Sequence, residues 1–209
     1  MAKNQISMSV IRRLPRYYRF LYDLMQNGIT RISSRDLAAR MGLTASQIRQ
    51  DLNCFGGFGQ QGYGYIVEQL YTEIGHILGV DNPAGAVLIG AGNLGCAIAN
   101  HIRFENRGIR LVGIFDDSPA IVCTRVQELE VQPTTALEAF CQAEKPAMAI
   151  LCIPREAAPD LVRRLTAQGI HSFWNFSHYD IAYDYPDAIV ENVHLGDSLL
   201  TLAYQMKAE

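Results

Sequence analysis

The sequence lacks any apolar run that approaches the roughly 18 residues needed for a membrane-spanning helix. Its N-terminus also lacks the basic-then-apolar pattern of a secretory signal. The five cysteines are scattered and form no CxxC pair, which argues against a zinc site or a dithiol redox motif and fits a reduced compartment. We therefore expect a cytoplasmic protein that is not inserted in a membrane and binds no metal.

Charge of either sign is scarce overall, but it is distributed unevenly. The net charge is −3, and 49% of the 209 residues are hydrophobic, enough to bury a core in one large or two modest domains. Residues 1–60 carry nine Lys/Arg and three Asp/Glu, whereas residues 81–209 carry nine against sixteen. A basic module on an acidic body indicates that the front of the chain meets a polyanion. Chance clustering of solvated charge is the alternative.

The front of the chain has the apolar spacing of helices. Apolar residues recur at helical intervals between residues 14 and 25, and Ser33-Ser34 offers a cap for a short helix that closes at Gly42. Thr44 and Gln47 then form a capping box, in which each side chain satisfies the other's orphan backbone donor. This box opens a third helix.

The third helix is the candidate recognition helix of a helix-turn-helix. One face is apolar, and the rest carries Ser, Gln, Arg and Asn side chains that can bond to base edges and phosphates. A helical pair with a solvated polar face is the alternative.

Glycines and aromatics alternate in residues 54–65 and predict a β-hairpin, or wing, around Gln60-Gln61-Gly62. The candidate DNA-binding residues are Arg12, Arg13, Arg16, Ser46, Gln47, Arg49, Gln50, Asn53, Gln60, Gln61 and Tyr63.

A glycine-rich loop marks the start of a second domain. Residues 86–89 form an apolar strand, and Gly90-Ala91-Gly92-Asn93-Leu94-Gly95 follows at once and leads into a helix. In such a GxGxxG loop the first glycine permits a tight turn, the second lets a pyrophosphate approach, and the third lets the helix pack on the strand. The phosphates then sit at the positive end of the helix dipole. A glycine-rich turn without a nucleotide is the alternative.

The strand after this helix ends in two acidic residues, Asp116-Asp117. Asp116 stands 21 residues after Gly95, where an acid accepts hydrogen bonds from the adenosine ribose hydroxyls. A carboxylate there repels a 2′-phosphate, so the sequence predicts NAD(H) rather than NADP(H).

Strands and helices continue to alternate after Asp117. Strands at 147–153, 172–176 and 188–191 and a helix at 157–168 predict an α/β fold with a parallel, Rossmann-type sheet. The loops after two of these strands should border the nicotinamide, because ligands sit at the carboxyl ends of such strands. The candidate cofactor-binding residues are therefore Gly90, Ala91, Gly92, Asn93, Leu94, Gly95, Asp116, Asp117, Ile153, Pro154, Asn175 and Phe176.

The chain ends in a helical stripe of apolar residues, which predicts a dimer element. We thus expect a DNA-binding domain at 1–80, an NAD(H)-binding domain at 81–193 and a dimerisation helix at 194–209.

An ordered set of motifs extends over nearly the whole chain. Its members include Arg13-Leu14-Pro15, Gln47-Ile48-Arg49-Gln50-Asp51-Leu52, Phe55-Gly56, Ile153-Pro154-Arg155-Glu156 and Glu191-Asn192-Val193. Together with the glycine loop, this set resembles the Rex family of bacterial redox-sensing transcriptional repressors. The resemblance implies a homodimer with winged helices, Rossmann domains and exchanged terminal helices. It also implies operator binding when NADH is scarce and release when NADH is bound.

The resemblance also draws attention to positions at which this chain departs from the family. It implies that His101 lies near the nicotinamide, where the family has an aromatic residue, and that His194 replaces an Asp associated with switching. Gln50 and Gln60-Gln61 stand where the family has basic residues. Each lost phosphate contact weakens nonspecific DNA affinity.

Two other functions stay open. Gln50 and Gln60-Gln61 would suit an NAD(H)-binding dimeric adaptor that has lost specific DNA binding. A small NAD-dependent oxidoreductase is the second alternative, but only about a dozen residues follow the sheet, too few for a domain that places a proton donor against a substrate. We therefore expect a regulator and not an enzyme.

Overall fold

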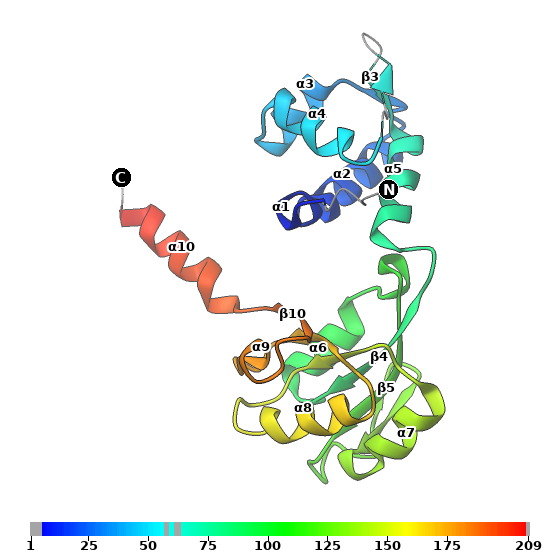
Figure 1. Cartoon of the computed structure of the whole chain (residues 1–209), viewed down its shortest axis with the longest axis vertical. Coiled ribbons are helices and arrows are strands. Elements are labelled where there is room, and N and C mark those ends of the chain that lie inside the picture. Colours follow the sequence, from blue (N-terminus) through cyan, green and yellow to red (C-terminus); the bar gives the residue numbers. More distant parts are fainter. Residues whose placement is uncertain (1–5, 57–58, 61–63, 208–209) are drawn as a thin grey trace. The chain divides into compact units, whose positions relative to one another are not determined.

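The chain folds into two units (Figure 1). The computed structural model describes residues 6–56, 59–60 and 64–207. The first unit is Met1–Asp81 and the second is Asn82–Glu209. The division falls just after Gly79, which ends the last helix of the first unit in the left-handed conformation with φ +74°.

The first unit combines a helix-turn-helix with a small sheet. In chain order its elements are α1 (Met8–Ile11), α2 (Leu14–Gln26), β1 (Arg31–Ile32), α3 (Ser34–Met41), α4 (Ala45–Asn53), β2 (Gly59–Gln60), β3 (Gly64–Ile66) and α5 (Val67–Leu78). The strands pair antiparallel in the order β1-β3-β2. The pairing of β2 with β3 confirms the predicted hairpin, although the predicted turn residues Gln61 and Gly62 lie outside the described part of the chain.

Side-chain caps set the helix starts in the helix-turn-helix. Ser33 accepts a hydrogen bond from the backbone N–H of Asp36 at 3.0 Å and caps α3, and Thr44 accepts one from the backbone N–H of Gln47 at 3.1 Å and caps α4. The second half of the predicted capping box is wrong. The Gln47 side chain donates to Asp51 Oδ1 at 2.9 Å instead, because a buried carboxylate competes for its amide.

The second unit is a seven-stranded sheet with helices on both faces. Its elements are β4 (Ala84–Ile89), α6 (Asn93–His101), η1 (Glu105–Arg107), β5 (Ile109–Asp116), β6 (Arg125–Val126), β7 (Leu129–Pro133), η2 (Thr134–Ala136), α7 (Leu137–Glu144), β8 (Met148–Leu151), α8 (Ala158–Ala167), β9 (Ser172–Asn175), α9 (Ile181–Asp184), β10 (Ile189–Asn192) and α10 (Leu195–Lys207). The strand order is β10-β9-β8-β4-β5-β7-β6, in which β6 alone pairs antiparallel. The six parallel strands follow the Rossmann order, which confirms the predicted fold class.

Two apolar layers enclose this sheet. Val87 and Ile89 of β4 pack with residues of α7, α8 and α9, whereas Ala86 and Leu88 pack with residues of α6. Alternate residues of β4 therefore face opposite layers, and its last four residues, 86–89, are buried, as expected for a central parallel strand.

The sequence reading missed several elements. It assigned nothing between Asp117 and Ala147, where the structure has β6, β7, η2 and α7. The strand predicted at 147–153 is shorter in the structure, Met148–Leu151. The strand predicted at 188–191 is shifted by one residue.

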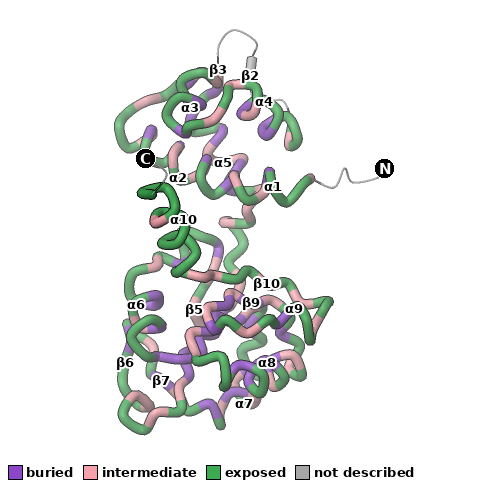
Figure 2. Tube along the Cα trace, turned by 90° about the vertical axis from the view of Figure 1, so that its left-hand side faces the viewer, coloured by how far each residue is buried: buried purple, intermediate pink, exposed green. Residues whose placement is uncertain are grey.

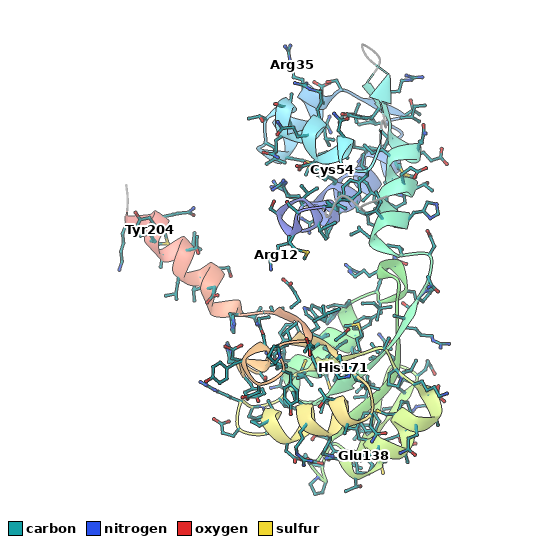
Figure 3. The ribbon with its side chains drawn as sticks, in the orientation of Figure 1. Arg12, Arg35, Cys54, Glu138, His171 and Tyr204 are labelled. Carbon is teal, nitrogen blue, oxygen red and sulfur yellow. The ribbon has the colours of Figure 1, made fainter. Side chains whose placement is uncertain are left out.

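The terminal helix α10 has no buried residue, and Figure 2 colours it as exposed along nearly all of its length. Its apolar side chains lie open to solvent in the single chain, at 66% for Leu199 and 72% for Met206. Figure 3 shows Tyr204 projecting from the same helix.

Candidate functional site

The backbone at the end of β4 is packed too tightly for any side chain at two of the three loop glycines. Gly90 has φ +94°, and a Cβ there would lie 2.4 Å from the carbonyl oxygen of Cys152, which follows β8. A Cβ on Gly95 would lie 1.8 Å from the carbonyl oxygen of Gly90. The fold itself therefore requires both glycines, because α6 starts directly against β4.

Gly92 differs from these two glycines, because nothing lies within 4 Å of the position its Cβ would take. It is the N-cap residue of α6, and Gly92, Asn93 and Leu94 are exposed. The free backbone donors of the first turn of α6 therefore border open space beside the neighbouring strands β4 and β8. This is the switch point of the sheet, where a phosphate can approach the backbone.

Asp116 is held against this loop by two backbone hydrogen bonds. Its Oδ2 accepts from the N–H of Ala91 at 2.7 Å, and its Oδ1 accepts from the N–H of Ser118 at 2.8 Å. Each carboxylate oxygen can accept a further hydrogen bond. The structure thus brings together the glycine loop and the acid that the sequence placed at the ribose.

The neighbouring Asp117 is tied to a residue that the sequence reading missed. The Thr134 hydroxyl donates to Asp117 Oδ1, and the Thr134 carbonyl oxygen accepts from Arg164 Nη2 at 2.5 Å. Thr134 is buried at 5% exposure. No local pattern marks it, since it follows a strand that the sequence did not reveal.

Asn175 lies in the predicted region, but its side-chain amide is fully occupied by hydrogen bonds within the protein. It is fully buried, its amide nitrogen donates to Tyr179 O and Asn192 Oδ1, and its Oδ1 accepts from the N–H and hydroxyl of Ser177. All four hydrogen-bonding positions of the amide are filled. The side chain of Asn175 therefore positions the loop after β9, and its contact with a ligand stays a prediction.

Ile153, Pro154 and Phe176 lie in the loops after β8 and β9, at the same edge of the sheet, whereas His101 lies at the opposite end of α6 from the glycine loop. Ile153 packs against Gly90, and Pro154 beside it is exposed. The Phe176 ring packs edge-on against Trp174, with centroids 4.8 Å apart. His101 is exposed at the C-terminal end of α6.

His194 forms a contact that the sequence did not predict. Its Nδ1 lies 2.7 Å from Nδ1 of His178, so one imidazole donates and the other accepts. His178 has φ +60° in the turn that Asn175 and Ser177 organise, and His194 directly precedes α10. His194 is therefore paired with a histidine from the loop after β9.

The candidate DNA-binding residues divide into two groups in the structure. Ser46, Arg49, Gln50 and Asn53 are exposed on α4, and Arg49 Nη1 donates to Ser34 Oγ at 3.2 Å. Arg12 is also exposed. The structure describes only the backbone of Gln60, and Gln61 and Tyr63 lie outside the described residues.

Arg13, Arg16 and Gln47 form the second group, because each is bonded within the first unit. Arg13 donates from Nε and Nη2 to Asp51 at 2.6 and 2.7 Å, and Gln47 donates to the same carboxylate at 2.9 Å. Arg16 Nη2 donates to Met41 O, at the end of α3, at 2.5 Å. Arg13 and Arg16 thereby connect helices of the first unit, whereas the Gln47 bond lies within α4, and the sequence predicted neither role.

Asp51 is the centre of this network and was missed as a functional residue. It is 1% exposed and also accepts a hydrogen bond from the Tyr17 hydroxyl at 2.7 Å. Burial alone raises the pKa of Asp51, but hydrogen bonds from Arg13, Tyr17 and Gln47 outweigh burial and leave the pKa below its usual value. The carboxylate is therefore charged at neutral pH.

Comparison with known proteins covers the whole chain. A family model described as a putative DNA-binding protein N-terminus matches residues 5–53, and one described as a CoA binding domain matches residues 81–179. The redox-sensing transcriptional repressor Rex of Thermoanaerobacter pseudethanolicus is 51% identical over 99% of this chain and 92% of its own length. That of Clostridioides difficile is 50% identical over 99% and 98%. This chain belongs to the Rex family of redox-sensing transcriptional repressors.

Solved structures of a Rex-family repressor agree with this assignment. RSP in complex with β-NADH matches with a TM-score of 0.89 and 47% identity, over 98% of this chain and 96% of that one. RSP in complex with β-NAD⁺ and operator DNA matches with a TM-score of 0.88 and 49% identity, over 97% and 93%. The Rex assignment that the sequence suggested is confirmed.

Two further observations concern only the described residues. The described residues contain no group of three or more His, Cys, Asp or Glu side chains arranged to hold a metal ion. Within the same residues, no helix combines the length and the apolar character needed to cross a membrane.

Substitutions at two of the loop glycines should have different effects, one on ligand binding and the other on the stability of the fold. We expect Gly92→Ala to leave the thermal stability of the protein nearly unchanged but to weaken NADH binding about tenfold or more, because its methyl group enters the space open to the pyrophosphate. Gly95→Ala should lower the stability itself by about 3 kcal/mol, because its methyl group meets the Gly90 carbonyl. Differential scanning calorimetry and NADH titration distinguish the two, and equal NADH affinity in Gly92→Ala and the parent would refute the assignment.

The Asp51 network predicts a specific acid sensitivity. Because the folded-state pKa of Asp51 is below its ordinary value of 3.8, the ionised carboxylate stabilises the first unit fully above that value. This stabilisation is lost as the pH falls through the lower, folded-state value. The stability advantage of the parent over Asp51→Asn in urea denaturation should therefore be constant from pH 7 to 5 and shrink below about pH 4. An advantage that does not change with pH would contradict this.

Proposed function

We propose that the chain is a redox-sensing repressor that binds operator DNA through its first unit and releases it when NADH occupies the second. The observation that carries this proposal is full-length similarity to a Rex-family repressor solved both with NADH and with NAD⁺ plus operator DNA. The relatives are transcriptional repressors and not enzymes. Such a regulator would act in the cytoplasm, where the chromosome and the NAD(H) pool meet.

The nucleotide site that we propose is the open edge of the glycine loop. The pyrophosphate would bind the first turn of α6 beside Gly92, and the adenosine ribose would bind the free lone pairs of Asp116. Of the two acids, Asp116 is the better candidate because it is anchored to the loop, whereas Asp117 is bonded to Thr134. The carboxylate also favours NAD(H) over a nucleotide with a phosphate on this ribose.

The DNA site that we propose is the exposed face of α4. Ser46, Arg49, Gln50 and Asn53 would meet bases and phosphates in the major groove, supported by Arg12 and by the wing residues Gln60, Gln61 and Tyr63. Arg49 is the only arginine or lysine on α4. It should therefore carry much of the affinity of that helix for phosphate or guanine.

The exposed helix α10 supports a homodimer. It presents Leu195, Leu199, Leu200 and Leu202 at exposures of 52–71%. An apolar face this large is costly in water and is typical of an interface. We propose that α10 contacts a second copy, which would bring two DNA-binding units together on a palindromic operator.

The switch then follows from linkage. A ligand that binds one dimer arrangement more tightly shifts the population toward it, and DNA that binds the other arrangement opposes the shift. An NAD(H)-binding adaptor, the second candidate suggested by Gln50 and the wing glutamines, would bind the nucleotide but show no preference for operator DNA.

The repressor hypothesis is tested by fluorescence anisotropy with a labelled palindromic operator at fixed salt. We expect specific binding that NADH reverses far more strongly than NAD⁺ or CoA. Arg49→Ala should weaken operator binding about tenfold or more, which corresponds to 1–3 kcal/mol, and leave NADH binding intact. Arg125→Ala, an exposed arginine of the second unit, is the matched control and should change neither. Operator binding that ignores both nucleotides, or no preference for any palindrome, would contradict the proposal.

A second prediction concerns nucleotide selectivity. Asp116→Ala should weaken NADH binding and raise the relative affinity for NADPH, because it removes both a ribose acceptor and the charge that repels a 2′-phosphate. Asp117→Asn keeps an acceptor for Thr134 and should leave the NADH/NADPH ratio close to that of the parent. Isothermal titration calorimetry measures both ratios. An unchanged ratio in Asp116→Ala would show that another residue selects the nucleotide.

A further inference from the structure

We propose that Asp51 is a positioning residue that fixes the rotation of the recognition helix α4, and that it thereby determines how well the protein distinguishes operator from other DNA. This inference rests on the proposed role of the first unit in operator binding. In this role Asp51, Arg13 and Tyr17 affect operator recognition without themselves contacting a base or a phosphate.

The geometry of the carboxylate supports this role. Asp51 lies on the buried side of α4 and accepts hydrogen bonds from Arg13 and Tyr17, which come from the N-terminal end of α2. Arg13 approaches with two donors, at 2.6 and 2.7 Å, and the Tyr17 hydroxyl approaches at 2.7 Å. Three directional bonds from one helix meet two oxygens on another, which restrains both the rotation and the sliding of α4.

A second polar contact holds the other half of the helix-turn-helix. Arg16, one turn along α2 from Arg13, donates to the carbonyl oxygen of Met41 at the C-terminal end of α3. Arg49 of α4 also reaches Ser34 at the N-terminal end of α3. Successive arginines of α2 therefore hold α3 and α4 separately, so the angle of the motif is set by polar contacts as well as by its core.

Apolar packing alone would restrain α4 less strictly. Ile48 and Leu52 bury its inner face, but hydrophobic contact has no preferred direction. A helix rotation of about 20° moves side-chain tips roughly 6 Å from the axis by roughly 2 Å. Such a movement exceeds the tolerance of a hydrogen bond to a base edge, so small rotations of α4 would affect specific binding first.

The burial of the Asp51–Arg13 ion pair also favours a role in positioning α4 over a role in stabilising the fold. Asp51 is 1% exposed and the Arg13 side chain is 28% exposed, so both groups lose much of their hydration. A buried ion pair gains little net stability over an apolar pair of similar volume, because desolvation offsets the attraction. Buried polar groups fix a unique arrangement in some systems, and the position of this pair beneath the recognition helix suits that role.

The central variant replaces the network by apolar groups, Arg13→Met/Tyr17→Phe/Asp51→Leu. It removes one positive and one negative charge, so the net charge and the counterion-dependent nonspecific affinity are preserved. The Tyr17→Phe change avoids leaving a buried hydroxyl without a partner. Asp51→Asn keeps the shape and removes only the charge. The control is Glu138→Leu/Arg164→Met, which removes a similar ion pair from the second unit.

The measurement is binding to an operator duplex and to a shuffled duplex of equal length and composition at the same salt. We expect the triple variant to weaken operator binding about tenfold or more while shuffled binding stays within about threefold of the parent. The operator affinity of Asp51→Asn should lie between that of the parent and that of the triple variant. The control should keep the operator preference of the parent. Circular dichroism and NADH titration should show that the variants remain folded.

Hydrogen exchange without DNA provides an independent readout of positioning. Amides of α4 should exchange faster in the triple variant, while those of α5 and of the second unit should not change. Parent-like operator preference in the triple variant, an equal loss on both duplexes, or unchanged exchange in α4 would each overturn the inference. A parent chain with no operator preference would instead refute the proposed function, and exchange in α4 would then decide the positioning role alone.

Discussion

Three strand ends meet at Gly90, and the arrangement of the nucleotide site depends on how closely their backbones pack there. The Gly90 N–H donates to Phe115 O of β5 at 2.8 Å, and the Cys152 N–H beyond β8 donates to Ile89 O of β4 at 2.8 Å. With Gly95 pressed against Gly90, α6 can start only in one direction. This places its free backbone donors, and the anchored carboxylate of Asp116, along one open edge. Preorganisation of this kind reduces the ordering cost of binding a charged, flexible dinucleotide.

The two units position their functional residues by different physical means. In the second unit the backbone does most of this, through glycines, strand ends and a helix terminus. In the first unit long polar side chains do it, because α2 holds α3 through Arg16 and α4 through Arg13 and Tyr17. A DNA-binding regulator needs its recognition helix held in one orientation. Directional hydrogen bonds to Asp51 restrain that orientation without a larger apolar core.

The sequence predicted what depends on short-range rules. The glycine loop, Asp116, the Thr44 cap and the β2–β3 hairpin could be recognised because their signals lie within a few residues or at a known spacing. The roles of Arg13 and Asn175 could not, because their partners lie 38 and 17 residues away, at Asp51 and Asn192. An arginine near a recognition helix suggests a contact with DNA. Only the folded structure shows that this arginine faces a buried carboxylate. No strand or helix was predicted between residues 118 and 146, so Thr134, which follows β7, was not recognised either.

The central claim is that NADH and operator DNA compete through one conformational equilibrium. Linkage requires the effect to be reciprocal, so that operator must lower the affinity for NADH by the same factor by which NADH lowers the affinity for operator. The most direct measurement is calorimetric titration of NADH into the protein alone and into its complex with a saturating operator duplex. We expect NADH to bind the complex more weakly, by about five- to 150-fold as is usual for such coupling, and NAD⁺ to show a smaller effect. Equal NADH affinity with and without operator would contradict it.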